Sequence, residues 1–284
     1  MFDYIFYRIG QFIALSLPLK AGYAFAVFVS DLRYLFAFGD RKIVSENLKA
    51  IFPEKSSREI RRIRIRVFRN FAKYLVDFFR FSKINKDSVG KYMGVENIQY
   101  LDQALKKGKG VVVLSAHLGN WELGGAVIGL LGYPFWVVVR PHKDKIVDDF
   151  FNKQRESKGL KIIPLGKAGR QCFRVLKENQ LLGLVGDRDF TDKGIALDFF
   201  GRPTIFPVGP AELSLKTGAT IIPGFMIRNS DDSCTLKIYK PVEFSPTGSE
   251  DDLTQLMKSY INIFEDAIRQ YPEQWYMFRR FWKA

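Results

Sequence analysis

The chain has 284 residues, of which 47% are apolar and 15% aromatic, and this composition suffices for a large packed core. It excludes a disordered chain. Lys and Arg number 44 against 30 Asp and Glu, so the formal net charge of +14 favours polyanionic partners, whether nucleic acids, anionic headgroups or phosphorylated sugars. Cys172 and Cys234 form no CxxC pair, and we expect both to be reduced and structural.

The amino-terminal segment is apolar but interrupted. Residues 9–19 and 21–29 are apolar apart from Gln11, Ser16 and a break at Pro18 and Lys20. The segment therefore lacks the roughly 20 uninterrupted apolar residues of a membrane span. We predict a helical hairpin in or against the bilayer, with a single span as the alternative. No cleavable signal peptide is expected, because the start has neither a basic segment nor a small-residue cleavage site.

A long amphipathic helix is expected to begin near Ser57. Ser56 and Glu59 have the spacing of a capping box, and Pro53 ends the preceding helix. At 100° per residue, an apolar face comprises Ile60, Ile63, Val67, Phe71, Tyr74 and Phe78, and a nearly opposite basic face comprises Arg58, Arg62, Arg66, Arg69 and Lys73. The basic face is either a solvated surface or a face set against anionic headgroups.

From residue 110 onward, short apolar runs alternate with helical segments. Strands are expected at 111–116, 134–139, 160–163, 181–185, 220–226 and 236–239, and helices at 144–157, 169–178 and 251–270. This alternation is typical of βαβ units, so we predict an α/β fold with a mostly parallel central sheet flanked by helices. A change of composition near residue 90 divides the chain into a helical, membrane-associating region, residues 1–90, and an α/β domain, residues 91–284.

The most informative stretch is residues 111–122, where an apolar strand leads into His117 and Glu122 follows five residues later. A neutral imidazole can take a proton near pH 7, and a nearby carboxylate fixes its tautomer. The chain has only two histidines, His117 and His142, although a histidine after a strand is often only a hydrogen-bonded loop residue. We predict a His117–Glu122 dyad that activates a nucleophile carried by the substrate.

The residues His117-Leu118-Gly119-Asn120-Trp121-Glu122 resemble the active-site signature of the late acyltransferases of lipid A biosynthesis, which reads His-Phe-Gly-Asn-Trp-Glu. The likeness continues in order through Val139-Arg140-Pro141, Gly186-Asp187-Arg188-Asp189-Phe190, Phe199-Phe200-Gly201-Arg202-Pro203, Gly218-Ala219, Pro223, Pro272-Glu273-Gln274-Trp275 and Arg279-Arg280. It covers nearly the whole chain.

The resemblance implies an enzyme that moves a fatty acyl chain from an acyl carrier protein to a hydroxyl of a lipid A precursor, an anionic glycolipid. The expected location is the cytoplasmic face of the inner membrane, on the membrane surface or with one amino-terminal anchor. No metal or cofactor is expected, because two histidines make no credible zinc set and thioester cleavage is downhill without one. No nucleic-acid module is recognisable, and no nucleic-acid partner is expected.

The same resemblance marks two further functional residues. By position, Arg155 is expected to contact phosphate or the acyl carrier, and Asp187 to organise the surrounding cations. From the residues themselves, His117, Arg140 and Asp187 each come at or just after the end of a predicted strand and are expected to converge on one edge of the sheet. Arg140 and Arg188 are expected to bind substrate, although Arg140 is equally a plain strand-end cation.

Other parts of the site follow from the chemistry of acyl transfer. The backbone amides of Gly119 and Asn120, at the start of a helix, are expected to hold the developing oxyanion and bind substrate. Phe199, Phe200, Phe206 and Pro207 are expected to wall the slot for the chain. Where the family often has a histidine before its paired arginines, this chain has Phe278, so no proton chemistry is assigned there.

Three alternatives stay open from the sequence. The same chemistry fits another acceptor, such as a lysophospholipid or a phosphatidylinositol mannoside. A thioesterase would use the same dyad on water. A non-catalytic binder of membranes or nucleic acids would use only the positive charge, but the ordered blocks around His117 argue against it.

Overall fold

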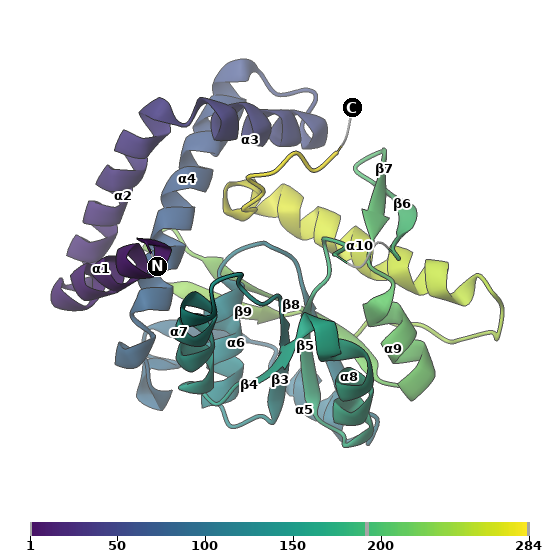
Figure 1. Ribbon diagram of the computed structural model, residues 1–284. Coiled ribbons are helices and arrows are strands. Elements are labelled where there is room, and N and C mark those ends of the chain that lie inside the picture. The colour runs from purple at the N-terminus through teal and green to yellow at the C-terminus, as the bar shows by residue number, and fades with distance from the viewer. Residues whose placement is uncertain (1, 191–192, 283–284) are drawn as a thin grey trace.

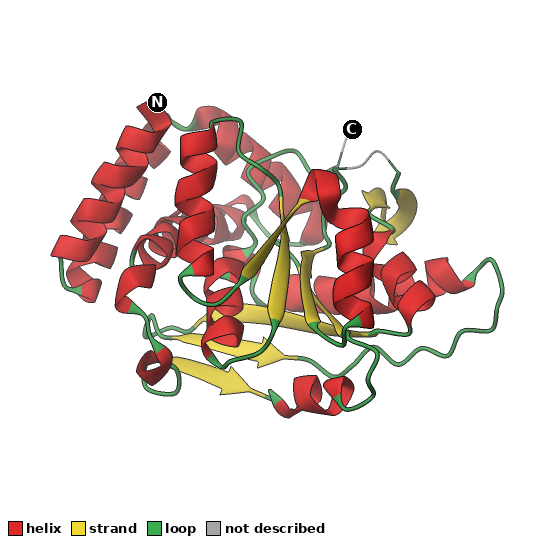
Figure 2. Cartoon of the chain, turned by 60° about the horizontal axis from the view of Figure 1, so that its bottom comes forward, coloured by secondary structure: helices red, strands yellow, loops and turns green. Residues whose placement is uncertain are grey.

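A computed structural model describes residues 2–190 and 193–282. Within these ranges a seven-stranded sheet has the order β1-β9-β8-β2-β5-β3-β4, with every neighbouring pair parallel except β8 and β9 (Figures 1 and 2). Its strands are β1 Met93–Glu96, β2 Val111–Ser115, β3 Phe135–Val139, β4 Lys161–Pro164, β5 Leu181–Val185, β8 Thr220–Arg228 and β9 Cys234–Ile238. β6 Ile195–Phe199 and β7 Arg202–Phe206 form a separate antiparallel pair. The predicted α/β class is confirmed.

Helices cover both faces of the sheet (Figure 2). They are α1 Phe2–Ser16, α2 Leu19–Phe36, α3 Phe38–Ile51, α4 Ser57–Phe79, α5 Gln99–Leu105, α6 Trp121–Leu130, α7 Lys145–Glu156, α8 Ala168–Lys177, α9 Gly209–Thr217 and α10 Asp252–Gln270. The buried side chains of α5, α6 and α7 form one hydrophobic cluster with one face of the sheet, and those of α8, α9 and α10 form another with the opposite face. The predicted long helix, the three later helices and the six predicted strands are all present, with ends shifted by a few residues at most.

Helix α4 begins as its capping residues predict. The Ser56 hydroxyl accepts from the Glu59 N–H at 3.3 Å, and the Glu59 carboxylate accepts from the Ser56 N–H at 2.9 Å. Ile60 and Val67 are buried, whereas the basic face carries the exposed Arg58, Arg62, Arg66 and Arg69. The helix therefore packs its apolar side inward and turns most of its basic side to solvent.

Helices α1, α2 and α3 pack around α4 at one side of the molecule (Figure 1). α1 ends at Ser16 and α2 begins at Leu19, so the predicted break at Pro18 is present. No single helix among the described residues is long and apolar enough to cross a membrane, and α2 with α3 qualifies only as a pair bent by 95°. The exposed large apolar side chains here are Ile5, Phe6, Ile9, Phe12, Leu19, Phe25, Phe28, Val29, Leu32, Leu35, Phe36 and Phe38. So large an apolar surface is typical of a face that binds a partner or a membrane.

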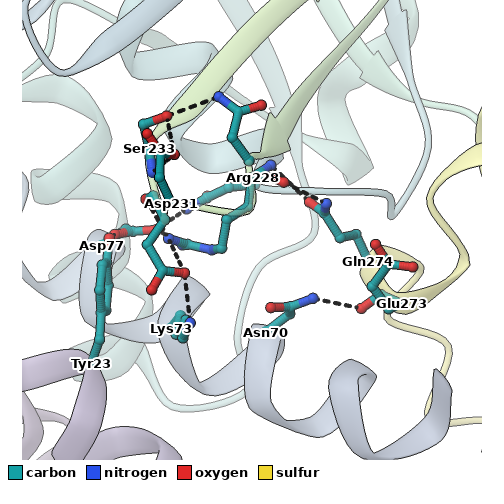
Figure 3. A network of polar contacts seen from close by, with 12 residues as sticks. Tyr23, Asn70, Lys73, Asp77, Arg228, Asp231, Ser233, Glu273 and Gln274 are labelled. Atoms are coloured by element: carbon teal, nitrogen blue, oxygen red, sulfur yellow. Dashed lines mark hydrogen bonds and ion pairs between the residues drawn. The ribbon is translucent and has the colours of Figure 1, made fainter. Parts of the chain in front are cut away.

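A buried polar network ties these helices to the α/β part (Figure 3). The Asp77 carboxylate on α4 accepts from the Tyr23 hydroxyl on α2, from the Arg228 guanidinium on β8, and from the Asn120 side-chain amide at 2.8 Å. The Asp77 and Arg228 side chains are only 6% and 4% exposed. Burial, together with the Asp77 carboxylate, raises the pKa of Tyr23, which therefore stays a neutral donor. One carboxylate thus joins four elements of the chain.

The buried pair is expected to matter far more than an exposed one. Asp77→Ala strands the Arg228 charge in the interior, so the free energy of unfolding should fall by about 3–5 kcal/mol. Asp31→Ala is the matched control, because Asp31 pairs with Arg69 on the surface, where both side chains are at least 40% exposed, and should cost less than about 1 kcal/mol. Denaturant unfolding in detergent measures both changes, and equal losses would contradict the role assigned to Asp77.

Candidate active site

The site is built on the loop that leaves β2 at Ser115 and enters α6 at Trp121. The carboxy-terminal segment holds this loop: Gly119 N–H donates to the Gln274 carbonyl at 2.9 Å, and Tyr276 N–H donates to the His117 carbonyl at 3.0 Å. Gly119 has φ +66°, and a Cβ there would lie 2.1 Å from the Met226 carbonyl oxygen. Only glycine fits where the loop passes so close to β8.

The segment that holds the loop is itself fixed to β8 by the Gln274 side chain (Figure 3). Arg228 N–H donates to Gln274 Oε1 at 2.8 Å, and Gln274 Nε2 donates to the Arg228 carbonyl at 2.8 Å. This amide side chain thereby makes the two hydrogen bonds to the backbone of Arg228 that a neighbouring strand would otherwise make. The block 272–275, quoted for the family likeness, therefore has a structural role.

The carboxylate that contacts the His117 ring is Asp187. His117 Nδ1 lies 2.5 Å from Asp187 Oδ1, and the His117 backbone N–H donates to Asp187 Oδ2 at 3.0 Å. Asp187 is completely buried. Burial alone would raise its pKa, but the contacts with His117 and the neighbouring Arg188 hold the pKa below its ordinary value. The carboxylate therefore stays ionised, which places the Nδ1 proton toward it and leaves Nε2 as the basic nitrogen.

The predicted His117–Glu122 contact is wrong for this structure. Glu122 lies in the first turn of α6 and pairs in a bidentate way with Arg155, which donates through Nη2 at 2.6 Å and through Nε at 2.9 Å. Arg155 Nη1 donates to Asn152 at 2.8 Å. Burial alone would lower the pKa of Arg155, and Glu122 raises it. Arg155, predicted to contact substrate, therefore pairs with Glu122, predicted to orient His117.

The predicted oxyanion donors are also corrected. Gly119 N–H is occupied by Gln274, and Asn120 N–H donates to the Met226 carbonyl at 2.7 Å. The Asn120 side chain is buried, and its Oδ1 caps α6 by accepting from Leu123 N–H at 3.1 Å. Gly119 and Asn120 thus hold the loop in place, and in this conformation neither backbone amide is free for substrate.

A cavity of about 1420 Å³ lies at the carboxyl edge of the sheet. The predicted residues that line it are His117, Glu122, Arg140, Arg155 and Arg188, while Asp187 lies behind the His117 ring. The strand ends explain this convergence, since parallel strands carry their following residues to one edge. Both histidines line the cavity, and burial together with Arg155 lowers the pKa of His142.

Three residues that the sequence did not assign also line the cavity. The Trp121 ring centroid lies 5.1 Å from that of His117, edge to face. Phe190 and Arg279 line the mouth and are both exposed. The sequence held a signal for each, because Trp121 lies inside the His117–Glu122 motif and the other two belong to blocks of the family likeness.

One part of the cavity extends along the face of the sheet that α6 covers, and residues of α8 and α9 line another part on the opposite face. Alternate residues of each strand point to one face, and those of the face that α6 covers line an apolar channel: Val113, Phe135, Val137, Gly183, Gly224, Met226 and Leu236. Across it, α6 presents Gly124, Gly125 and Ile128. Glycine inside a helix costs about 1 kcal/mol relative to alanine, so two in succession need a packing or functional reason. Here they let the helix lie close to the sheet beside an open channel.

The predicted wall of phenylalanines is wrong. Phe199 and Phe206 are fully buried, and Phe200 is 9% exposed; all three pack in the core, where Phe199 and Phe200 contact the Trp282 ring. Pro207 alone of that set lines the cavity. Large aromatic side chains are the residues that a core buries most readily, and here core packing prevails.

Comparison with known proteins assigns the chain to a family. Residues 2–284 match the family described as bacterial lipid A biosynthesis acyltransferase. The chain belongs to this family. The predicted resemblance is confirmed, and the expectation of an acyltransferase rests on a match over nearly the whole chain.

Individual relatives are named for two different acceptors. A phosphatidylinositol mannoside acyltransferase of Mycolicibacterium smegmatis is 31% identical over 219 residues, which cover 76% of this chain and 70% of the relative. The lipid A biosynthesis palmitoleoyltransferase of Escherichia coli is 28% identical over 247 residues, 84% of this chain and 78% of the relative. The lauroyltransferase of the same organism is 22% identical over 274 residues, 95% and 88% of the two chains.

Conservative substitutions distinguish the two candidate partners of His117. Asp187→Asn preserves shape but puts an amide N–H against Nδ1 and favours the wrong tautomer, so kcat for acyl transfer should fall by about 10²- to 10⁴-fold. Glu122→Gln leaves His117 and Asp187 in contact. The kcat of Glu122→Gln should therefore stay at least tenfold higher than the kcat of Asp187→Asn. Steady-state kinetics of both purified variants is the measurement. A large loss of kcat in Glu122→Gln with a mild loss in Asp187→Asn would instead support the predicted His117–Glu122 dyad.

Proposed function

We propose that this protein transfers a fatty acyl chain from an acyl-carrier-protein thioester to a hydroxyl of an acidic glycolipid, with a lipid A precursor as the first candidate acceptor. The observation that supports the proposal most is the pair of His117 and the buried Asp187 at the wall of a cavity that continues into an apolar channel. A base and a chain-sized slot are what transfer of a fatty acyl group requires.

The reaction follows from the orientation of the imidazole. His117 Nε2 takes the proton of the acceptor hydroxyl as its oxygen bonds to the thioester carbonyl carbon. The resulting imidazolium is stabilised by Asp187, which stays ionised throughout. When the tetrahedral intermediate collapses, the C–S bond breaks and the imidazolium returns the proton to the leaving sulfur. The products are an ester and a free carrier thiol, and the histidine is regenerated without any metal or cofactor.

Glu122 and Arg155 serve the reaction from the cavity wall. Their side chains are 11% and 10% exposed, and each satisfies the charge of the other. Together they form a rigid, nearly neutral polar surface beside His117 that can accept and donate hydrogen bonds to the sugar. We therefore keep Glu122 and Arg155 in the site as groups that position substrate.

The acyl chain is proposed to lie in the channel under α6. The channel begins beside His117 and is lined by apolar side chains and glycines, so a hydrocarbon chain entering it loses no hydrogen bonds. Burial of each methylene contributes about 0.8 kcal/mol. The depth of this channel would thus select the length of the donated chain.

The surroundings suit a substrate held in a membrane. The exposed apolar side chains of residues 5–38 would enter the interface of the inner membrane at its cytoplasmic face, and the net charge of +14 would attract both anionic headgroups and an acidic carrier protein. This arrangement would bring a glycolipid hydroxyl to the enzyme without extracting the lipid completely.

A phosphatidylinositol mannoside is the second candidate acceptor, because the relative named for it shares 31% identity with this chain. A lysophospholipid acceptor would use the same chemistry. A thioesterase would use the same histidine on water, yet the glycolipid named for the relatives and the apolar amino-terminal surface both favour transfer to a lipid.

A labelled donor tests transfer and the role of His117 together. With acyl carrier protein that bears a radiolabelled chain and membranes as the source of acceptor, the wild-type protein should produce acylated lipid. His117→Ala should lower that rate by at least about 10³-fold because it removes the base, while circular dichroism stays unchanged. Label released only as free fatty acid would identify a thioesterase, and normal transfer by His117→Ala would refute the assignment of the base.

Substitutions in β3 and β4 test whether the acyl chain lies in the channel under α6. Val137→Phe narrows the channel under α6, so the preferred donor should become shorter by several methylenes. Ile162→Phe is the matched control, because Ile162 is the register partner of Val137 on β4 and is also partly buried but does not line the cavity, so chain preference should stay unchanged. Competition among donors of different length, with product lipids weighed by mass spectrometry, gives the preference. Val138 lines the cavity from the opposite face of β3, so a shift in Val138→Phe with none in Val137→Phe would place the chain on that face of the sheet.

A further inference from the structure

Three arginines from distant segments gather at the cavity mouth. Arg140 follows β3, Arg188 lies three residues beyond the end of β5, and Arg279 belongs to the carboxy-terminal segment. All three line the same cavity as His117. The Arg140 and Arg279 guanidinium carbons lie 5.0 and 5.8 Å from the ring centroid of Phe190, which lines the mouth beside them. We call these four residues the arginine collar.

In the described part of the chain, no ion pair joins the collar arginines to a carboxylate, and the Phe190 ring orients Arg140 and Arg279 instead. A cation over an aromatic ring is oriented by the ring but keeps its full charge, unlike a cation paired with a carboxylate. Arg280, the next residue after Arg279, shows the contrast, since its Nε donates to Glu46 at 3.1 Å away from the cavity. The two paired arginines of the sequence thus have different environments, and only the first faces the cavity.

Arg188 carries the clearest sign of a missing ligand. Its Nη2 donates to the Tyr276 carbonyl at 3.3 Å and contacts Met277 Sδ at 3.0 Å, while its Nε is buried and has no hydrogen-bond partner among the described residues. Burial lowers the pKa of Arg188, Asp187 opposes that change, and Arg279 adds repulsion. Asp187 itself is committed to His117. Bringing two guanidinium groups together at a partly buried site costs free energy that a bound anion would recover.

We propose that the arginine collar binds a phosphate group of a substrate while the reacting carbonyl lies at His117. Guanidinium groups bind phosphate oxygens in a planar, often bidentate geometry, and three of them at one mouth match a tetrahedral anion better than a carboxylate. The proposal rests on the proposed function, which offers two sources of that phosphate. One is the phosphodiester of the prosthetic arm of an acyl carrier protein, and the other is the headgroup of the acidic glycolipid.

Kinetics with one substrate varied at a time identify the source. Arg140→Ala and Arg279→Ala change exposed side chains, so the fold should persist, and each should raise one KM by at least about tenfold with kcat changed by less than about threefold. A higher KM for the carrier thioester assigns the phosphate to the donor, and a higher KM for the glycolipid assigns it to the acceptor. Arg279→Lys should recover part of the loss. Arg280→Ala is the matched control and should behave as wild type.

A direct measurement of phosphate binding tests the arginine collar independently of acyl transfer. Inorganic phosphate, titrated calorimetrically into the full-length protein in detergent, should bind at least tenfold more weakly to the Arg140→Ala/Arg279→Ala double variant than to wild type or to Arg280→Ala. His117→Ala should keep phosphate binding and lose transfer. Phosphate binding by a wild-type protein that transfers no acyl group would refute the proposed function and leave the collar intact. Equal phosphate binding and equal KM values in the double variant and in Arg280→Ala would overturn the collar.

Discussion

The contact between His117 and Asp187 is the constraint on which the site depends. β2 and β5 are parallel neighbours in the register Ser115 with Val185, so the residues two positions beyond each strand end, 117 and 187, meet at the edge of the sheet. The Asp187 carboxylate is completely buried there, and both of its oxygens are engaged by the ring and backbone of His117. An ionised carboxylate so enclosed is stable only with such partners. The tautomer of the histidine therefore follows from the pairing of two strands.

The loop that carries His117 is fixed from three sides at once. The carboxy-terminal segment supplies main-chain bonds to residues 117 and 119, β8 accepts from the Asn120 N–H, and Asp77 of α4 accepts from the Asn120 side chain. Because Tyr23 of α2 also donates to Asp77, a chain of hydrogen bonds runs from the amino-terminal helices to the cap of α6. These hydrogen bonds thereby link the surface proposed to meet the membrane to the loop that carries His117.

The sequence predicted what depends on local periodicity and capping. The six strands of the alternating pattern, α4 with its capping box and the break at Pro18 all follow from signals within a few residues. β1, β6 and β7 lack such a signal: β1 reads Met-Gly-Val-Glu, without the adjacent isoleucines that mark the equally short β4, and the other two strands pair only with each other. Gathering His117, Arg140 and Asp187 at one edge was also predictable, because it needs only the rule that parallel strands end together.

The same rule could not identify which carboxylate contacts the His117 ring. Glu122 is five residues away in sequence, but the turn at Gly119 starts a helix whose first turn presents Glu122 to Arg155. Choosing Asp187 instead requires knowing that β5 lies beside β2 and in which register, and both depend on the complete sheet order. The same holds for Phe199 and Phe200, which pack against the ring of Trp282, more than 70 residues away in the chain. Proximity in the chain is a poor guide wherever a sheet brings distant residues together.

The distribution of charge in the cavity gives the two kinds of substrate group separate places. Glu122 and Arg155 cancel each other beside His117, so the inner wall carries little net charge, and the channel beyond it carries none. The guanidinium groups of the arginine collar, which form no ion pair among the described residues, lie at the mouth. A hydrocarbon chain gains by moving inward, whereas a phosphate gains by staying at the mouth and would lose its hydration in the channel. If the phosphate is that of the acyl carrier, one of the two sources proposed above, the donor would be held in one direction, with its thioester near the imidazole.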